Sequence, residues 1–315
     1  MLKLAVLHAE FLAWSRRRGA AGPTLHNDRV AARAFGLFLA EQTIEDLGRI
    51  TPAEIAAFQA YLARVDSVRG RPYAAGTRLG FLAWVRKFFG YLHREGLILV
   101  DPTSRMRLPR KPRRLPRAVL SADEMRQLLW TPDVSTPGGL RDRAILEILY
   151  GLGLRFSELA NLTVADVDLE ERTLWVRQGK GKRDRLLPLG RWSTHWLRRY
   201  LDASDPARRE QGTDLVFLTP RRKRLTNWVL VRILRAYAHR AGITKPITPH
   251  TLRHSFATAM LKGGADIRGL QRFLGHTQIT STEVYTHLDL GDLRRAQDRC
   301  HPRERRQTPP APEKP

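Results

Sequence analysis

The stretch Thr248–His287, TPHTLRHSFATAMLKGGADIRGLQRFLGHTQITSTEVYTH, carries the most distinctive combination of side chains in this chain. His250 and Arg253 are three residues apart, so on a helix they share one face. Arginine is a permanent cation with a fork of donors, and histidine can carry a proton. This pairing suits a phosphodiester whose oxygens gain charge as it reacts.

The second half of this stretch contains His276 and Tyr285, which are nine positions apart. On one straight helix they would face opposite sides. Gly275, Thr277 and Thr280 predict a break, so that a loop can bring the two side chains together. Beside two histidines and an arginine, Tyr285 is a candidate covalent nucleophile toward phosphorus.

Composition narrows the class of protein. The chain has 315 residues, which predicts two domains, and its 55 Lys and Arg against 31 Asp and Glu give a net charge of +24. This excess favours a polyanion partner, and DNA or RNA is favoured over a membrane because no long apolar run exists. A single cysteine, Cys300, excludes an internal disulfide and a cysteine-based zinc cluster. With no signal-peptide pattern at the N-terminus, we expect a cytoplasmic protein.

Residues 1–100 have the apolar spacing of helices only, and we expect a small bundle with the aromatic residues in its core. The predicted helices are Leu2–Arg18, Leu25–Glu41 with Thr24 as N-cap, a helix opened by the capping box Thr51–Glu54, and Gly76–Glu95. The last helix carries basic residues that are candidates for DNA contacts, with solvated surface as the alternative: Arg78, Arg86 and Lys87.

Residues 101–118 are predicted to be a linker, because the stretch Pro102–Arg117 has four prolines and seven basic residues without an acid, which favours an extended chain. Such a strap can cross a phosphate backbone, and a solvated hinge is the alternative. Its candidate DNA contacts are Arg110, Lys111, Arg113 and Arg114.

Residues 119–300 are predicted to form an α+β domain, followed by a mobile tail at 301–315 that is rich in proline and charge. Its expected helices are one opened by Ser121–Glu124, then Gly139–Tyr150, a short one opened by Ser157, Trp192–Leu201, Asn227–Ala241 and Gly291–Cys300. Its expected strands are Arg172–Arg177, Arg183–Leu189 and Leu215–Leu218. The first two form a hairpin with Lys180 at its tip, and the glycines of Gly151–Arg155 place Arg155 in a tight turn.

Five motifs therefore stand in one order along residues 120–300: Gly153–Arg155, Gly179–Gly181, His250–His254, Leu274–His276 and Tyr285. This order resembles the tyrosine recombinases of the phage-integrase superfamily, and among them the Xer type. The resemblance implies an N-terminal helical core-binding domain of the SAM-like kind and a catalytic domain that acts on double-stranded DNA. It also implies a tetramer on two paired sites and a C-terminal segment that docks on a neighbouring subunit, and it leaves open whether a second recombinase is a partner.

The resemblance further implies a role for each matched residue. Arg155 and Arg253 would hold the non-bridging oxygens of the scissile phosphate, and Lys180 would protonate the leaving 5′ oxygen. His250 would take part in proton transfer with the tyrosine, and His276 would donate to a phosphate oxygen. Tyr285 would attack phosphorus and form a 3′-phosphotyrosyl link, while Glu158 would orient its neighbours.

Elementary chemistry agrees with these roles. A free tyrosine has a pKa near 10, so a cationic pocket and a histidine that accepts the proton lower the cost of forming the phenolate. Arginines and a lysine can supply the counter-charge of a metal, and the covalent link preserves the energy of the phosphodiester. We therefore predict that no metal, no ATP and no other cofactor is needed.

The sequence as a whole predicts a mainly α-helical chain with a small antiparallel β-sheet, acting as a site-specific DNA recombinase. Two alternatives remain: a type IB topoisomerase-like enzyme that relaxes DNA, and a DNA-binding protein without catalysis. The target site, the choice among integration, excision, transposition and resolution of chromosome dimers, and the need for an accessory motor are left open.

Overall fold

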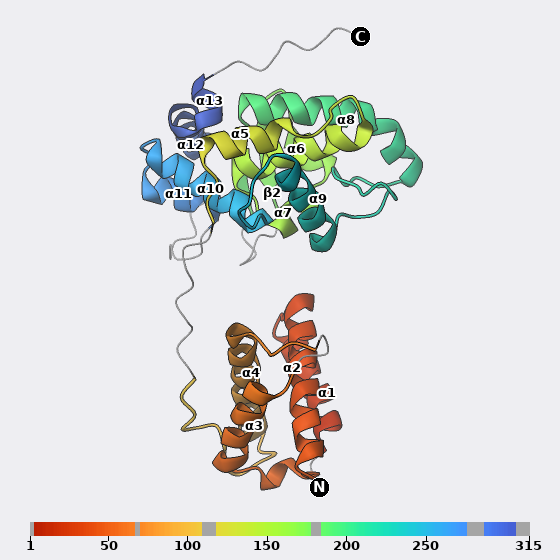
Figure 1. The fold of residues 1–315 in the computed structure, drawn as a ribbon, viewed down its shortest axis with the longest axis vertical. Helices are drawn as coiled ribbons and strands as arrows, with labels where there is room; N and C mark the ends of the chain where they lie inside the picture. Colours follow the sequence, from red (N-terminus) through yellow and green to blue (C-terminus); the bar gives the residue numbers. More distant parts are fainter. Residues whose placement is uncertain (1–2, 67–69, 109–117, 178–183, 276–286, 307–315) are drawn as a thin grey trace. The chain divides into compact units, whose positions relative to one another are not determined.

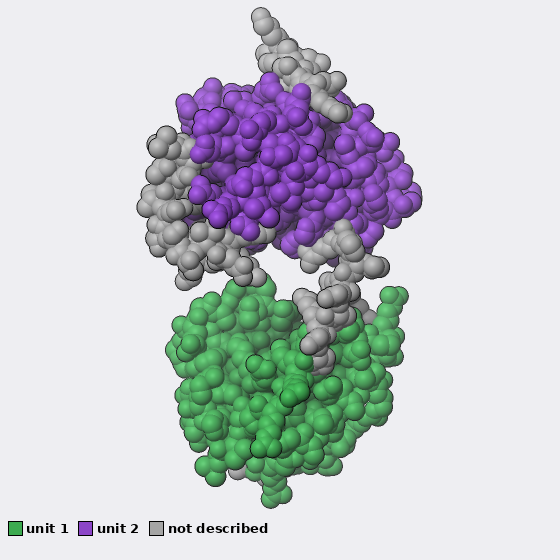
Figure 2. All heavy atoms as spheres, turned by 90° about the vertical axis from the view of Figure 1, so that its left-hand side faces the viewer, with its two compact units in different colours: residues 1–115 green, residues 116–315 purple. Residues whose placement is uncertain are grey.

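The computed structural model describes residues 3–66, 70–108, 118–177, 184–275 and 287–306. It is mainly α-helical with one small antiparallel sheet, as predicted (Figure 1). The chain divides into two compact units, residues 1–115 and residues 116–315, which Figure 2 colours separately. None of the helices within the described ranges combines the length and the apolar character that crossing a bilayer requires.

The described part of the first unit is a bundle of four helices. They are α1 (Leu4–Arg17), α2 (Gly22–Glu41), α3 (Pro52–Arg64) and α4 (Ala75–Arg94), with a short 3-10 turn, η1 (Leu47–Arg49), before α3. The predicted capping box opens α3, where a Glu54 carboxylate oxygen accepts from the Thr51 N–H at 2.8 Å. The predicted start of α2 is wrong: Pro23 fits the first helical turn, so Thr24 lies inside the helix and does not cap it.

Aromatic rings form much of the core of this unit. Phe88 is fully buried, stacks on Trp84 with 5.0 Å between ring centroids, and meets Phe11 edge-on at 5.4 Å. Aromatic pairs of this kind contribute ~0.5–1.5 kcal/mol each beyond the burial of their area. The prediction that the aromatic residues of α4 belong to the core is confirmed.

The predicted linker begins too early. Asp101 accepts hydrogen bonds from the N–H and the hydroxyl of Thr103 at 2.7 and 2.6 Å, and Met106 and Leu108 pack against the core of the first unit. Residues 101–108 therefore belong to the bundle. Four of the candidate DNA contacts lie outside the described residues: Arg110, Lys111, Arg113 and Arg114.

The second unit is built around a helix that is buried along most of its length. Its helices are α5 (Ala122–Trp130), α6 (Pro137–Leu152), α7 (Phe156–Ala160), α8 (Arg191–Gln211), α9 (Asn227–Arg240), α10 (Pro249–Lys262), α11 (Ile267–Leu274), α12 (His287–Cys300) and α13 (Pro302–Arg306), with a 3-10 turn, η2 (Val164–Asp166). Every residue of α6 from Gly139 to Leu152 is buried, and the helix packs against α8 and α10 (Figure 1). The hydrophobic centre of the unit thus follows α6.

A three-stranded antiparallel sheet lies beside these helices in the order β1 (Val167–Asp168), β2 (Thr173–Val176), β3 (Arg185–Pro188). The predicted pairing of β2 with β3 is confirmed. Val176 pairs with Arg185 at the end of the ladder nearest the turn, and the turn itself, residues 178–183, lies outside the described residues. β1 is an addition that the sequence did not suggest, because two residues are too few to show an alternating pattern.

Two further boundaries differ from prediction. α8 continues ten residues beyond Leu201, where the apolar spacing that marks a helix stops. The predicted strand Leu215–Leu218 is wrong: its ends form only isolated bridges, with Thr163 and Arg224. Val216, Phe217 and Leu218 are buried without joining the sheet.

The first part of the predicted tail also differs from prediction, because residues 301–306 are packed rather than mobile; residues 307–315 lie outside the described residues. His301 is 1% exposed, and its Nε2 lies 3.3 Å from the carbonyl oxygen of Tyr150. Arg191 donates to the backbone carbonyl of Glu304 at 2.7 Å. Proline and charge in this segment suggested a tail, but its buried side chains find partners in their own unit.

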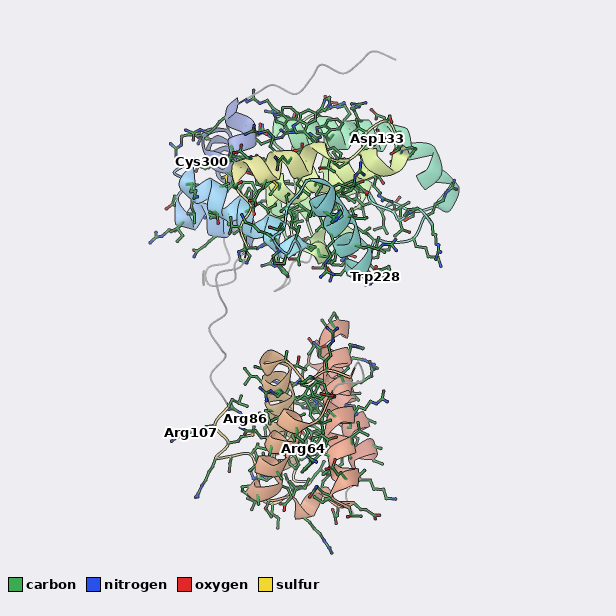
Figure 3. All side chains as sticks on the ribbon, viewed as in Figure 1. Arg64, Arg86, Arg107, Asp133, Trp228 and Cys300 are labelled. Carbon is green, nitrogen blue, oxygen red and sulfur yellow. The ribbon has the colours of Figure 1, made fainter. Side chains whose placement is uncertain are left out.

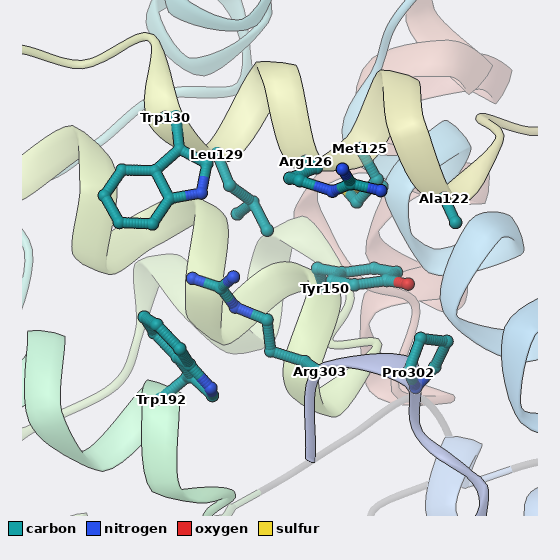
Figure 4. Close-up of a pocket in the computed structure, with 9 residues that line it drawn as sticks. All are labelled: Ala122, Met125, Arg126, Leu129, Trp130, Tyr150, Trp192, Pro302 and Arg303. Carbon is teal, nitrogen blue, oxygen red and sulfur yellow. The ribbon is translucent and has the colours of Figure 1, made fainter. Parts of the chain in front are cut away.

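Arg303 anchors the same segment. It donates to Glu147 at 2.6 Å, and its guanidinium lies 3.6 Å from the ring centroid of Trp192. Figure 4 shows this guanidinium between the rings of Trp130 and Trp192, at the wall of a pocket of about 260 Å³. These contacts hold α13 against α6 and α8.

Candidate active site

Arg155 is positioned by the sharp end of α6. Gly153 ends that helix with φ of +59°, and a Cβ there would lie 2.5 Å from the Phe256 ring. Both the backbone conformation and the lack of space therefore require glycine. Arg155 then takes an extended conformation as the N-cap of α7.

Glu158 holds the Arg155 side chain. Its two carboxylate oxygens accept from the Arg155 N–H and from the Arg155 guanidinium, each at 2.8 Å. The Glu158 side chain is 3% exposed and that of Arg155 is 20% exposed, so the arginine reaches the surface from a buried carboxylate. The predicted orienting role of Glu158 agrees with this geometry.

Arg253 approaches the same place from α10. Its guanidinium donates to the carbonyl oxygens of Gly153 and Leu274, both at 2.6 Å. Arg155 donates to the next carbonyl, that of Gly275, at 3.1 Å. The two arginines, 98 positions apart in the sequence, therefore meet at the C-terminal end of α11.

This end of α11 favours cations. The last carbonyls of a helix have no partner within the helix and form the negative end of its dipole. Because a guanidinium has five N–H donors, Arg155 and Arg253 can bind these carbonyls and still offer donors to a phosphate. The arginines are thus fixed by the protein before any substrate binds.

The charges of this group remain in place at neutral pH. Burial, and then the charge of Arg155, lowers the pKa of Arg253 to about 10, which still leaves it protonated. Burial alone would raise the pKa of Glu158, but hydrogen bonds and charge from Arg185 and Arg155 outweigh it and the pKa lies below its usual value. The site therefore holds permanent cations around one ionised carboxylate.

His250 is exposed in the first turn of α10, three residues before Arg253. The Thr248 hydroxyl caps this helix by accepting from the Thr251 N–H at 3.2 Å. His250 and Arg253 are thus on one helix, as predicted. The role of His250 in proton transfer stays a prediction.

Three predicted catalytic residues lie outside the described residues: Lys180, His276 and Tyr285. The described residues nearest to two of them are known. His276 follows Gly275 directly, and Lys180 lies in the connection between β2 and β3. The structure brings together Arg155, Glu158 and Arg253 of the predicted set.

The candidate DNA contacts of α4 differ from one another. Arg86 is exposed (Figure 3), and Arg78 is half-buried. Lys87 lies 3.3 Å from an Asp28 carboxylate oxygen and 4.9 Å from the Phe11 ring centroid. These contacts give Lys87 a structural role in the bundle, so Arg86 is the better candidate for a phosphate contact.

Sequence reasoning missed Arg185, a buried arginine that also binds Glu158. A signal was present: Arg185 is two residues from the buried Leu187, and residues two apart on a strand face the same side. An arginine on the inward face of a strand requires a buried partner.

Known proteins resemble this chain over most of its length. Residues 118–291 match the phage integrase family. The chain is 38% identical over 284 residues to tyrosine recombinase XerC 2 of Ralstonia nicotianae, covering 90% of this chain and 82% of that protein. It is 39% identical over 264 residues to tyrosine recombinase XerD of Listeria innocua, covering 83% of this chain and 86% of that protein.

Solved structures show the same fold. A λ integrase dimer bound to a COC′ core site matches with a TM-score of 0.67 and 21% identity, over 91% of this chain and all of that one. A λ integrase tetramer bound to a Holliday junction matches with a TM-score of 0.66 and 21% identity, over 90% of this chain and 81% of that one. The Xer relatives, which are named tyrosine recombinases, set aside the topoisomerase-like and non-catalytic alternatives. The chain belongs to the phage integrase family and is a tyrosine site-specific recombinase of the Xer type.

Proposed function

We propose that this recombinase cuts and rejoins DNA through a covalent link between Tyr285 and a 3′ phosphate. The observation that supports this most is the pair of arginines fixed at the C-terminal end of α11, directly before His276. Two held cations beside the chain that leads to a tyrosine suit a phosphodiester whose negative charge increases during the reaction.

In this proposal, Arg155 and Arg253 bind the two non-bridging oxygens and stabilise the pentavalent transition state. The phenol oxygen of Tyr285 attacks phosphorus, and its proton passes to the site, with His250 taking part. Lys180 gives a proton to the departing 5′ oxygen, and His276 donates to a phosphate oxygen. One P–O bond forms and one breaks, so the reverse reaction with a new 5′ hydroxyl reseals the strand.

The energy balance of this exchange explains why no ATP is proposed. A phosphodiester is exchanged for a phosphotyrosine ester, and the same kind of bond is restored at the end. The counter-charge comes from side chains, so we expect strand cleavage to persist in the presence of a chelator. Positioned proton transfer by these groups contributes roughly 10²–10⁴-fold to the rate.

We further propose that four copies act on two paired sites in the cytoplasm, either alone or with a second recombinase. The structure of λ integrase as a tetramer on a Holliday junction supports such an assembly. The basic groups that we propose to bind the DNA backbone are Arg78 and Arg86 of α4, together with Arg110, Lys111, Arg113 and Arg114. Integration, excision and resolution differ in how the sites are placed, and all three use the same chemistry.

The test uses duplex sites recovered by binding selection from random DNA. A nicked version of such a site lets the short 5′ product leave, so the covalent protein–DNA adduct accumulates. We expect the parent protein to form the adduct with and without a chelator, and Tyr285→Phe to bind the site without forming it. Adduct formation by Tyr285→Phe would contradict the proposal. Loss of the parent protein's adduct on adding a chelator would contradict it as well.

A further inference from the structure

Arg185, at the first position of β3, is a third arginine at the site, and it is buried. Its side chain is 3% exposed. Two of its nitrogens donate to the two oxygens of Glu158 at 3.0 and 2.9 Å, a bidentate pair. Its Nε donates to the carbonyl oxygen of Phe273 at 3.1 Å.

With this contact, three successive carbonyls at the end of α11 each accept from a different arginine. Phe273 accepts from Arg185, and the two carbonyls that follow accept from Arg253 and Arg155. The residue at the end of this series, Gly275, has φ of +61°, and a Cβ there would lie 3.0 Å from the Arg185 guanidinium. The arginine and the helix end are therefore fitted to each other closely.

Glu158 is shared between Arg185 and Arg155. One of its oxygens, Oε1, accepts from both guanidinium groups, at 3.0 Å from Arg185 and 2.8 Å from Arg155. An isolated carboxylate with a single arginine partner can rotate about that contact. The bidentate bond from Arg185 fixes the plane of the carboxylate, and hence the direction from which it holds Arg155.

Burial separates the role of Arg185 from that of the other two arginines. The Arg185 side chain is 3% exposed and its guanidinium is bonded to Glu158 of α7 and Phe273 of α11, whereas the Arg155 side chain is 20% exposed. This burial favours a role through neighbouring groups over a direct contact with DNA.

We propose that Arg185 is a positioning residue for strand cleavage, which aligns Arg155 on the scissile phosphate through Glu158 and through the end of α11. The inference rests on the proposed function and adds to it a residue outside the six matched catalytic positions. A displacement of about 1 Å at a reacting group costs on the order of 10²-fold in rate. We therefore expect Arg185→Met to slow adduct formation by about 10–100-fold per folded molecule, with site binding close to that of the parent.

The matched control is Arg141→Met. Arg141 is also buried, and it donates to the Asp142 carboxylate at 2.8 Å and to the Leu218 carbonyl at 3.2 Å. This variant loses the same kinds of contact in the same unit, but away from α11. We expect it to be destabilised like Arg185→Met while its folded fraction reacts at the parent rate, which separates positioning from folding.

The chemical step is probed with a second substrate, in which sulfur replaces the leaving 5′ oxygen. Sulfur leaves without a general acid, so this substrate removes the need for Lys180. If Arg185 acts through Arg155, Arg185→Met loses the same factor on both substrates. Recovery of the parent rate on the sulfur substrate would overturn the proposal, because the effect would then lie in protonation of the leaving group.

Two more variants keep the test decisive if Arg185→Met folds poorly. Arg185→Lys can reach one oxygen of Glu158 but cannot form the fork, so we expect an intermediate rate. Glu158→Gln should lose a similar factor, and the double variant should react no more slowly than the slower single variant, because both act through one contact. The inference would be refuted if the losses of Arg185→Met and Glu158→Gln were additive in the double variant. It would also be refuted if Arg185→Lys and Arg185→Met both reacted at the parent rate. In either case the adduct formed by the parent protein would still support the proposed function.

Discussion

The two units of this recombinase bury different kinds of side chain. Among the described residues of the first unit, Asp28 is the one buried charged residue, and the core is made of aromatic and aliphatic groups. The described part of the second unit buries nine charged residues: Arg141, Asp142, Arg143, Glu147, Glu158, Asp166, Arg185, Arg253 and Glu304. The first unit is stabilised by apolar packing, whereas the second unit also keeps buried charged groups in defined positions.

This difference indicates that the second unit carries the catalytic function. Removing an ion pair from water costs several kcal/mol per ion, and apolar residues of similar volume often stabilise a fold as well or better. Stability alone therefore does not account for the buried charges of the second unit. One group, around Glu158, fixes the arginines of the site, and another, around Glu147, fixes α13.

The largest effect is expected in the apolar core of the first unit. Phe88→Ala removes a fully buried ring that contacts Trp84 and Phe11, and should destabilise the bundle by about 3–5 kcal/mol. Hydrogen exchange resolved along the chain measures this, with the second unit as the internal reference. Unchanged protection of α1 and α4 would contradict the assignment of this core.

The buried charges of the second unit can be tested by a substitution that preserves shape. Glu147→Gln leaves Arg143 buried without its counter-charge, 1% exposed between the rings of Trp130 and Trp196, and should cost roughly 3–5 kcal/mol. Urea unfolding of the second unit measures the loss.

The matched control for that substitution is Glu170→Gln. Glu170 is 83% exposed in its pair with Arg198, so its loss should cost less than about 1 kcal/mol. If the two variants lost the same stability, burial would not be what distinguishes the pairs.

A third prediction separates charge held for chemistry from charge held for stability. Arg253→Lys keeps the positive charge but cannot bind the Gly153 and Leu274 carbonyls together and still offer a fork to the phosphate. Single-turnover adduct formation should slow by about 10²–10³-fold, as for loss of one transition-state donor. Arg86→Lys in the first unit should leave that rate nearly unchanged, and an equal loss in both variants would break the distinction.

The fourth prediction concerns pH and α13. Burial lowers the pKa of His301 from its usual 6.5 to about 4, and its Nδ1 accepts from the Arg303 N–H, which requires the neutral ring. The unfolded chain therefore takes up a proton first as the pH falls. The second unit should lose up to about 3 kcal/mol between pH 6.5 and 4, and little more from this group below pH 4.

His301→Gln removes the titrating group and is the test of that prediction. Its stability should change less with pH over the same window, measured by urea unfolding at several pH values. A pH profile parallel to that of the parent would assign the acid sensitivity to other groups.

The smallest effect is expected at the exposed surface of the first unit. Arg86→Ala should weaken binding to all duplex sites by a similar factor and reduce the slope of log affinity against log salt by about 1, as for loss of one phosphate contact. A change in sequence preference without a change in slope would instead assign Arg86 to base reading.

The sequence predicted the parts of this molecule that depend on local patterns. Capping boxes at Thr51 and Ser121 and the spacing of apolar residues located the helices, and the order of motifs identified Arg155 and Arg253. It could not predict contacts made over long separations, such as that between Arg185 and Phe273. The segment 301–306 was misjudged for the same reason, since its partners Glu147 and Tyr150 lie about 150 positions away.

The central claim is that a tyrosine of this chain becomes esterified to DNA beside arginines that the protein fixes in advance. Mass spectrometry of the digested adduct measures this most directly, by finding which residue carries the nucleotide and which end of the strand is attached. The account predicts Tyr285 joined to a 3′ phosphate, with a free 5′ hydroxyl on the other strand end. Attachment to another residue, or to a 5′ phosphate, would contradict it.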